Sequence, residues 1–120
     1  MTNPVQLSAG NAAFDSLVSD WMVALNERGM SARTRDEYLH SMRDLKAWLV
    51  AHGSSLAPTD ISAASIQEWL TDPTIHRSGA VRRARWTAAR SFFSWVQELG
   101  ITATDPMAEI SAPVSPPADH

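Results

Sequence analysis

A short basic segment concentrates the residue types that can recognise an anion. Residues 78–95 read SGAVRRARWTAARSFFSW, and together with Arg77 they hold five of the chain's ten basic residues and no acidic residue. The chain as a whole has a formal net charge of -3. Guanidinium groups and hydroxyls along one helix suit the phosphates and base edges of the DNA major groove. The segment therefore predicts a DNA-binding helix in a mildly acidic protein.

The same segment predicts a long helix, from Ser78 to Leu99, with one apolar and one cationic side. Its apolar residues include Val81, Trp86, Ala89, Phe92, Phe93, Val96 and Leu99. The opposite side carries Arg83, Thr87, Arg90 and Ser94, with Arg82 on its border. Arg77 and Ser78 lie at the helix start, where free backbone N–H groups and the helix dipole favour an anion. Arg85 falls toward the apolar side, so it must pair with another group or extend to solvent.

A second predicted helix, ended by Gly53, offers a matching surface. Its core stripe is Tyr38, Met42, Leu45 and Leu49, with Trp48 on the flank. Its outward positions are His40, Arg43 and Ala47, with Lys46 beside them and Arg33 and Thr34 at the start. Two helices of one domain could then hold the same duplex. Arginine is also a good helix former, so a solvated face without a ligand is the alternative.

Other kinds of chemistry have no support in the sequence. The chain has 120 residues, the length of one domain, and no cysteine, which excludes disulfides and thiolate chemistry. Its four histidines lack metal-site spacing, and we expect no cofactor or metal. The five tryptophans are assigned to the core, and the single tyrosine, Tyr38, to packing. Without an export signal or a long apolar run, we expect a cytoplasmic location and no membrane partner.

The start of the chain predicts a first amphipathic helix. Phe14, Leu17, Val18, Trp21, Met22 and Leu25 form its apolar stripe. Gly29 supplies its C-terminal stop. The helix after it has two possible starts, either Ser31 as an N-cap or Thr34 with Glu37 as a capping box.

The second half of the chain also predicts helices. No alternating strand pattern appears anywhere in the sequence, so the predicted fold class is all-α. Ser62 can cap a short helix that carries Ile66, Trp69 and Leu70 and is closed by Pro73. Asp105 and Pro106 predict one short final turn of helix. The predicted fold is therefore a bundle of four main helices with a short fifth helical turn. The predicted domain organisation is a flexible N-terminus at 1–10, one DNA-binding domain at 11–110 and a flexible tail or linker at 111–120.

Three segments, in order, resemble one protein family. TRDEYLHSMRDLKAWL places Thr34, Tyr38, Met42, Leu45, Trp48 and Leu49 at the spacing of a family motif. RWTAARSFFSW is similar to the family segment Arg-Leu-Ser-Ala-Leu-Arg-Ser-Phe-Phe-x-Trp, and TDPMAEI to its Asn-Pro-x3-Ile ending. Together they span residues 14 to about 113 and resemble the N-terminal core-binding domain, often called SAM-like, of tyrosine recombinases of the phage integrase and Xer group.

The resemblance implies a bundle that sits on one face of a recombination site, with catalysis in a separate C-terminal domain. It implies that the second and fourth helices enter the major groove and that Thr34, Arg43, Thr87 and Arg90 contact DNA. It also implies contacts between recombinase protomers on DNA through the first helix and the final turn. The chain departs from the family at Trp86 and Ala89, which replace leucines, and at Asp105, which replaces asparagine.

Double-stranded DNA and other recombinase protomers are therefore the expected partners. The expected DNA-binding residues are Arg33, Thr34, His40, Arg43, Lys46, Arg77, Ser78, Arg82, Arg83, Thr87 and Arg90. We expect a tyrosine recombinase as the parent protein and no DNA cleavage by this chain, because Tyr38 lies in a core stripe and no catalytic domain follows. The alternative is a SAM-like protein-interaction module without DNA binding, favoured by the net acidity and by Trp21 or Met22 if they are exposed.

Overall fold

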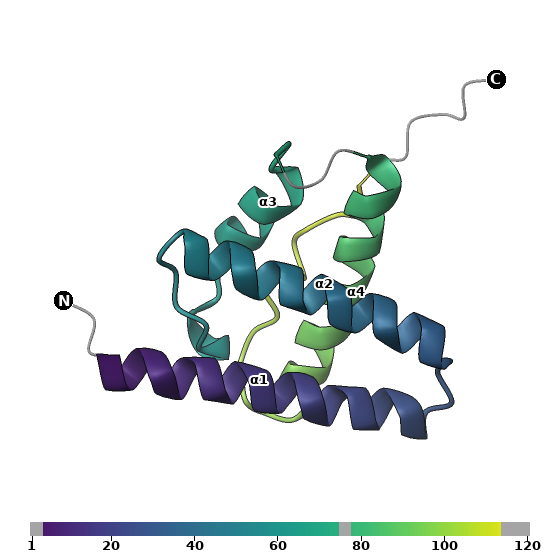
Figure 1. Cartoon of the computed structure of the whole chain (residues 1–120), viewed down its shortest axis with the longest axis horizontal. Coiled ribbons are helices and arrows are strands. Elements are labelled where there is room, and N and C mark those ends of the chain that lie inside the picture. Colours follow the sequence, from purple (N-terminus) through teal and green to yellow (C-terminus); the bar gives the residue numbers. More distant parts are fainter. Residues whose placement is uncertain (1–3, 75–77, 114–120) are drawn as a thin grey trace.

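Helices account for the regular structure throughout the part of the chain that the computed structural model describes, residues 4–74 and 78–113. In chain order, α1 spans Pro4–Glu27, α2 Ala32–Ala51, the 3-10 helix η1 Pro58–Asp60, α3 Ala63–Thr71 and α4 Gly79–Glu98 (Figure 1). No strand occurs in these ranges. The predicted all-α bundle of four main helices is confirmed.

Serine side chains begin three of the helices. Ser31, Ser62 and Ser78 each accept a hydrogen bond from the backbone N–H three residues later, which satisfies one of the free donors at a helix start. This decides between the two predicted starts of α2 in favour of Ser31. At the other end, Gly53 and Gly100 follow α2 and α4 with φ of 67° and 76°, a left-handed conformation that glycine adopts without strain.

The first helix begins earlier than the sequence analysis placed the domain. It starts at Pro4, inside the segment 1–10 that was predicted to be a flexible N-terminus. The physical reason is that proline is accepted in the first turn of a helix, where its missing N–H would have no partner. The residues that follow include no further proline to interrupt the helix.

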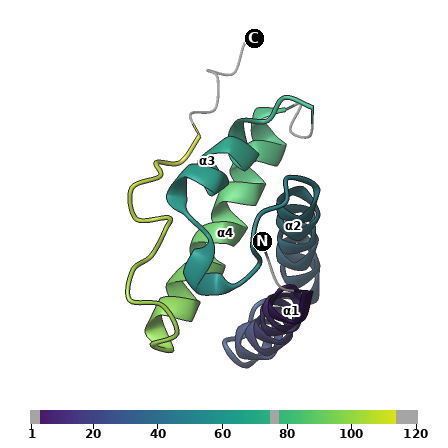
Figure 2. The same cartoon turned by 90° about the vertical axis from the view of Figure 1, so that its left-hand side faces the viewer.

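The helices pack in two directions. In Figure 1, α1 and α2 lie side by side and run in opposite directions, and α4 crosses them. Figure 2 views α1 and α2 along their axes. In this view α3 lies against α4. In this arrangement α2 and α4 each contact all three of the other α-helices.

Aromatic side chains hold α1, α2 and α4 together. The ring of Phe92 in α4 lies 5.6 Å from Phe14 and 5.2 Å from Trp21, both in α1. Tyr38 of α2 stacks on Trp21 at 5.6 Å with 15° between the ring planes. Such ring pairs add about 0.5–1.5 kcal/mol to the area they bury. The predicted packing role of Tyr38 is therefore confirmed.

The burial pattern corrects several sequence predictions. Trp21 is fully buried and Met22 is half-buried against the core, so neither is the exposed interface residue that the protein-interaction alternative required. On α4, Val81 and Leu99 are exposed although both were assigned to the apolar side, because they lie near the two ends of the helix. Trp95 is buried there, as the core assignment of the tryptophans requires.

The segment after α4 runs back along that helix and forms turns at the place of the predicted fifth helical turn. Residues 106–109 form hydrogen-bonded turns, not a helix. The carboxylate of Asp105 accepts from the backbone N–H of Met107 at 2.8 Å, and Trp86 Nε1 donates to the Ile110 carbonyl at 2.9 Å. Met107 and Ile110 are buried. The hydrogen bond from Trp86 therefore anchors the end of these turns to α4.

A polar contact joins the ends of α2 and α3. Trp48 Nε1 donates to the carboxylate of Asp72, the C-cap of α3, at 2.9 Å. Thr74 donates to the same carboxylate through its hydroxyl at 2.6 Å and its backbone N–H at 2.9 Å. The hydrogen bonds from Thr74 and Trp48 favour the ionised form and lower the pKa of Asp72 from 3.8 to about 2.

Among the described residues, no helix combines the length and the apolar character needed to cross a lipid bilayer.

Candidate nucleic-acid interface

A groove of about 470 Å³ lies where α2 and α4 cross, and we call it the α2–α4 groove. From α2 it is lined by Glu37, Tyr38, His40 and Ser41. From α4 it is lined by Ala80, Arg83, Ala84, Arg85 and Thr87. The small side chains of Ala80 and Ala84 leave the space between the two helices open. The groove therefore brings together three of the predicted DNA-binding residues: His40, Arg83 and Thr87.

Buried polar contacts fix the floor of this groove. Arg85 Nη1 donates to the Ser41 hydroxyl at 3.0 Å, and Arg85 Nε lies 3.6 Å from the Asp44 carboxylate. Trp69 Nε1 of α3 donates to the same carboxylate at 2.9 Å. The Arg85 side chain is only 13% exposed, so its charge is used inside the protein. As the sequence analysis required, Arg85 is paired, and it sets the crossing of α2 and α4.

The outward arginines of α4 are placed differently. Arg83 is exposed, and its Nη1 donates to the Pro113 carbonyl at 3.4 Å, a long contact. Arg90 is exposed, with its guanidinium carbon 5.5 Å from the centre of the Trp86 ring. Thr87 donates its hydroxyl to the Arg83 carbonyl at 2.9 Å, which leaves the oxygen free to accept. Both guanidinium groups are therefore accessible to an anion.

The predicted residues at the start of α2 are also accessible. Arg33 has a side chain 90% exposed and lies 3.6 Å from the Glu37 carboxylate in an exposed pair. Thr34 accepts a hydrogen bond from the Ser31 hydroxyl at 2.9 Å, so it belongs to the helix cap. His40 is exposed beside the groove. An exposed ion pair of this kind contributes at most about 1 kcal/mol, so Arg33 can exchange partners readily.

Other predicted site residues lie apart from the groove. Lys46 forms an ion pair with Asp15 of α1, with both carboxylate oxygens within 2.9 Å, and so holds α1 against α2. Arg43 and Lys46 line a separate hollow of about 300 Å³ between those two helices. Arg82 is half-buried with its Nε enclosed in protein, and the Ser78 hydroxyl caps α4. Arg77 lies outside the described residues.

Two bacterial recombinases are similar to this chain in sequence. It is 32% identical over 93 residues to tyrosine recombinase XerC of Xanthomonas campestris pv. campestris and 34% identical over 88 residues to tyrosine recombinase XerC of Mycobacterium tuberculosis. These alignments cover 75% and 71% of this chain, which spans 28% of the length of each relative. No family model matches the chain.

The fold is similar to that of the integrase from mycobacterium phage Brujita. The two structures superpose with a TM-score of 0.72 and 25% sequence identity, over 88% of this chain and 34% of the integrase chain. The chain contains a Xer-like integrase-family domain. The resemblance that three sequence segments indicated is thereby confirmed.

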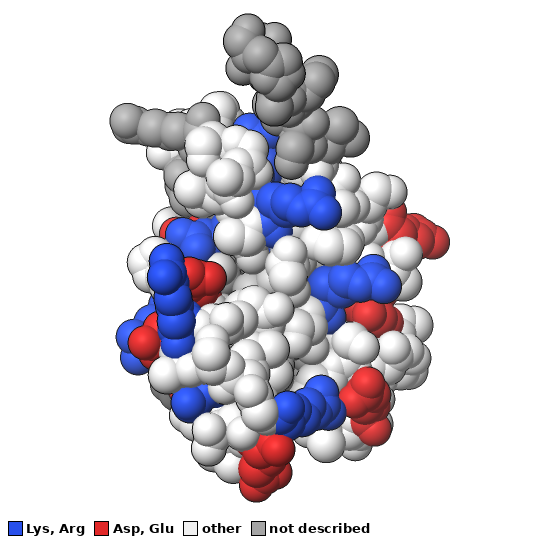
Figure 3. Space-filling view, turned by 90° about the vertical axis from the view of Figure 1, so that its right-hand side faces the viewer, with Lys and Arg blue, Asp and Glu red and all other residues white. Residues whose placement is uncertain are grey.

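The charged side chains of this integrase-family domain are unevenly spread over its surface. Figure 3 looks at the side of the molecule on which α2 begins in Figure 1. Lys and Arg side chains surround a central uncharged area there, and many of the Asp and Glu side chains lie toward the edges of the view. Cations around an uncharged centre suit a polyanion that contacts several points at once.

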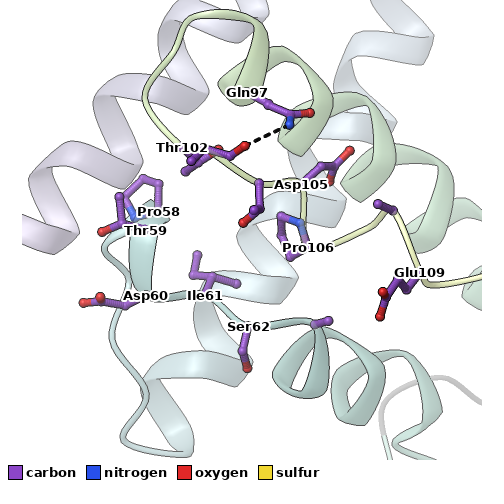
Figure 4. Close-up of a pocket in the computed structure, with 14 residues that line it drawn as sticks. Pro58, Thr59, Asp60, Ile61, Ser62, Gln97, Thr102, Asp105, Pro106 and Glu109 are labelled. Carbon is purple, nitrogen blue, oxygen red and sulfur yellow. Dashed lines mark hydrogen bonds between the residues drawn. The ribbon is translucent and has the colours of Figure 1, made fainter.

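A larger groove of the domain has the opposite charge. It measures about 890 Å³, lies between residues 58–63 and the segment after α4, and is called the acidic groove below (Figure 4). Asp60, Asp105 and Glu109 line it, and its described lining includes no Lys or Arg. Carboxylates repel phosphate, so the lining of this groove disfavours DNA despite its size.

Some lining residues of the α2–α4 groove had no functional prediction. Ala80 and Ala84 are one helical turn apart, and their small size beside Arg83 is a signal that the sequence contains. Glu37 was considered only as the capping-box partner of Thr34. Ser31 is the N-cap of α2 instead. The place of Glu37 in the groove depends on the crossing of two distant helices, which a single helical wheel does not give.

Proposed function

We propose that this domain binds duplex DNA through α2 and α4, which enter the major groove, as part of a site-specific tyrosine recombinase. The observation that carries the proposal is the α2–α4 groove, which Arg83 and Thr87 line; Arg33 of α2 and Arg90 of α4 are exposed on the same two helices. The sequence similarity to tyrosine recombinases XerC supports the same conclusion. The major groove of B-DNA is wide enough to admit an α-helix.

The affinity of the domain comes mainly from phosphate contacts. Arg33, Arg43, Arg83 and Arg90 are exposed, and each can neutralise one phosphate. Each neutralised phosphate contributes about 0.9 to the slope of log affinity against log salt, so four contacts give a slope of about -3 to -4. Few contacts and a net charge of -3 make the affinity of this domain modest.

Strand cleavage belongs to a different domain of the recombinase. The single tyrosine of the chain, Tyr38, is half-buried and stacked on Trp21, where its ring joins two helices. A nucleophilic tyrosine must instead present its hydroxyl to a phosphate beside activating groups. The packing of Tyr38 therefore supports a binding role for this chain, with other recombinase protomers as its neighbours on DNA.

A titration of labelled duplex DNA at several salt concentrations tests the proposal. A pool of sequences makes any preference visible, and Arg83→Glu is compared with Arg28→Glu. Both variants change the charge by the same amount, but Arg28 pairs with Glu98 at 3.6 Å, near the end of α4 far from Arg83. We expect a slope of about -3 to -4 for the unmodified domain and about one unit less for Arg83→Glu.

Equal weakening by the two variants would mean that net charge alone matters, and it would contradict the assignment of the groove. No binding at low salt would contradict the proposed function itself.

A further inference from the structure

Glu37 is the acidic residue among the described side chains that line the α2–α4 groove. Its side chain is 62% exposed, and its ion pair with Arg33, at 3.6 Å, is exposed as well. Elsewhere the groove and its rim present cationic and neutral groups. A carboxylate at this place lowers the affinity for any polyanion, so its presence calls for a compensating interaction.

The backbone at Glu37 is held firmly. Its carbonyl accepts a hydrogen bond from the Ser41 hydroxyl at 3.1 Å, and that hydroxyl accepts from Arg85 of α4 at 3.0 Å. Arg85 is anchored in turn by Asp44. The Glu37 side chain therefore extends into the groove from a fixed backbone position. A side chain held in this way favours contact with one particular group of a ligand.

An ionised carboxylate can only accept hydrogen bonds. In the major groove, guanine presents the acceptors N7 and O6, and thymine presents the acceptor O4 and a methyl group. Adenine has an amino donor, but the acceptor N7 lies beside it. Cytosine presents an amino group at N4 and is the base that a carboxylate contacts most favourably.

We infer that Glu37 selects a cytosine at one position of the DNA site by accepting a hydrogen bond from its N4 amino group. The inference rests on the proposed function, because it requires a duplex whose major groove faces the α2–α4 groove. Arg83 and its exposed neighbours supply affinity on any sequence. Glu37 weakens binding to sequences that lack the amino group, so it contributes specificity through repulsion as well as attraction.

Selection of bound duplexes from a randomised pool tests this role with four proteins: the unmodified domain, Glu37→Ala, Glu37→Gln and Asp36→Asn. Asp36 is an exposed carboxylate next in sequence that does not line the groove, so Asp36→Asn is the charge-matched control for Glu37→Gln. Affinities are then measured on duplex pairs that differ only at the selected base pair. Melting temperatures confirm that each variant is folded.

The unmodified domain and Asp36→Asn are expected to prefer cytosine at one position by about tenfold. Glu37→Ala should lose that preference, and Glu37→Gln should move it to adenine, whose N6 and N7 a glutamine amide can contact together. Preferences at other positions should not change.

Two results would overturn the inference and are distinct from each other. If Glu37→Ala and Glu37→Gln bind all sequences more tightly and keep the same base preferences, Glu37 is only repulsive and the proposed function stands. If the unmodified domain binds no duplex, the proposed function fails and the inference fails with it.

Discussion

The α2–α4 groove and the acidic groove differ in both size and charge. The smaller groove carries basic residues, and the larger one carries acidic residues. The α2–α4 groove measures about 470 Å³ and contains Arg83 and Arg85, whereas the acidic groove measures about 890 Å³ and contains Asp60, Asp105 and Glu109. For a polyanionic ligand the sign of the charge decides, because phosphate binding is largely electrostatic. The comparison teaches that the sign of the charge, and not the volume, distinguishes the two grooves as sites for a polyanion.

The two arginines within the α2–α4 groove also differ from each other. Arg85 is 13% exposed and bound to Ser41 and Asp44, whereas Arg83 is exposed and makes one long contact with a carbonyl. Side chains two positions apart on a helix point in different directions, which gives one arginine to the core and the other to the surface. Position on α4 therefore separates an arginine with a structural role, Arg85, from one that we propose binds DNA, Arg83.

The largest expected effect comes from reversing the charge on the cationic side. Arg83→Glu combined with Arg90→Glu should lower the affinity for duplex DNA at least about a hundredfold at low salt, because each change removes a phosphate contact and adds repulsion. Both side chains are exposed, so the melting temperature should stay nearly unchanged. Fluorescence anisotropy and circular dichroism measure the two quantities. An unchanged affinity for DNA would contradict the assignment of DNA binding to the α2–α4 groove.

Arg85→Ala should act on stability instead. The substitution removes one partner of Asp44 and of Ser41, and we expect the free energy of unfolding to fall by about 2 kcal/mol, less than for a fully enclosed ion pair. Urea unfolding measures the change. Below the transition, the folded variant should keep a salt slope close to that of the unmodified domain. Unchanged stability with a smaller slope would instead make Arg85 a phosphate ligand.

Glu109→Lys should have a small effect on DNA binding, although it adds the same charge that Arg83→Glu removes. Glu109 lines the acidic groove and is not among the described residues that line the α2–α4 groove, and salt at 0.1 M weakens the interaction of exposed charges. We expect the affinity for DNA to rise by less than about threefold at that salt concentration. A rise as large as the loss in Arg83→Glu would show that DNA approaches the acidic groove as well.

The smallest expected effect is a change in stability with pH, caused by a carboxylate that stabilises the fold. The pKa of Asp72 is lowered to about 2, below its ordinary value of 3.8, so its ionised form stabilises the folded state above about pH 4. This contribution is lost as the pH falls from 4 toward 2. The difference in melting temperature between the unmodified domain and Asp72→Asn should shrink over that interval. A constant difference would mean that ionised Asp72 does not stabilise the contact with Trp48.

Local patterns in the sequence predict most of the fold. Serine caps, positive-φ glycines and apolar stripes are short-range features, and they placed α2, α3 and α4 within a residue or two of their observed bounds. The predicted final helical turn corresponds to hydrogen-bonded turns at residues 106–109, and a distant contact, from Trp86 to the Ile110 carbonyl, follows them. The start of α1 was missed because the residues before Phe14 show no apolar stripe.

The candidate site could be predicted only in part, because it combines surfaces of two helices. A helical wheel correctly puts Arg83, Thr87 and Arg90 on the exposed side of α4. It does not reveal that Asp15 of α1 binds Lys46, or that Glu37 faces the groove, because both depend on how helices pack. The first feature requires the packing of α1 against α2, and the second requires the crossing of α2 over α4, which Arg85 and Asp44 help to fix.

Titration of the isotope-labelled domain with duplex DNA, followed by amide NMR shifts, tests the central claim most directly. The account predicts that amides of residues 37–41 and 80–87 shift progressively while those of residues 58–63 and 102–109 stay in place. The shifts should diminish as salt is raised, because bound cations compete for the phosphates. Shifts confined to residues 58–63 and 102–109, or none at low salt, would contradict the assignment of DNA to the α2–α4 groove.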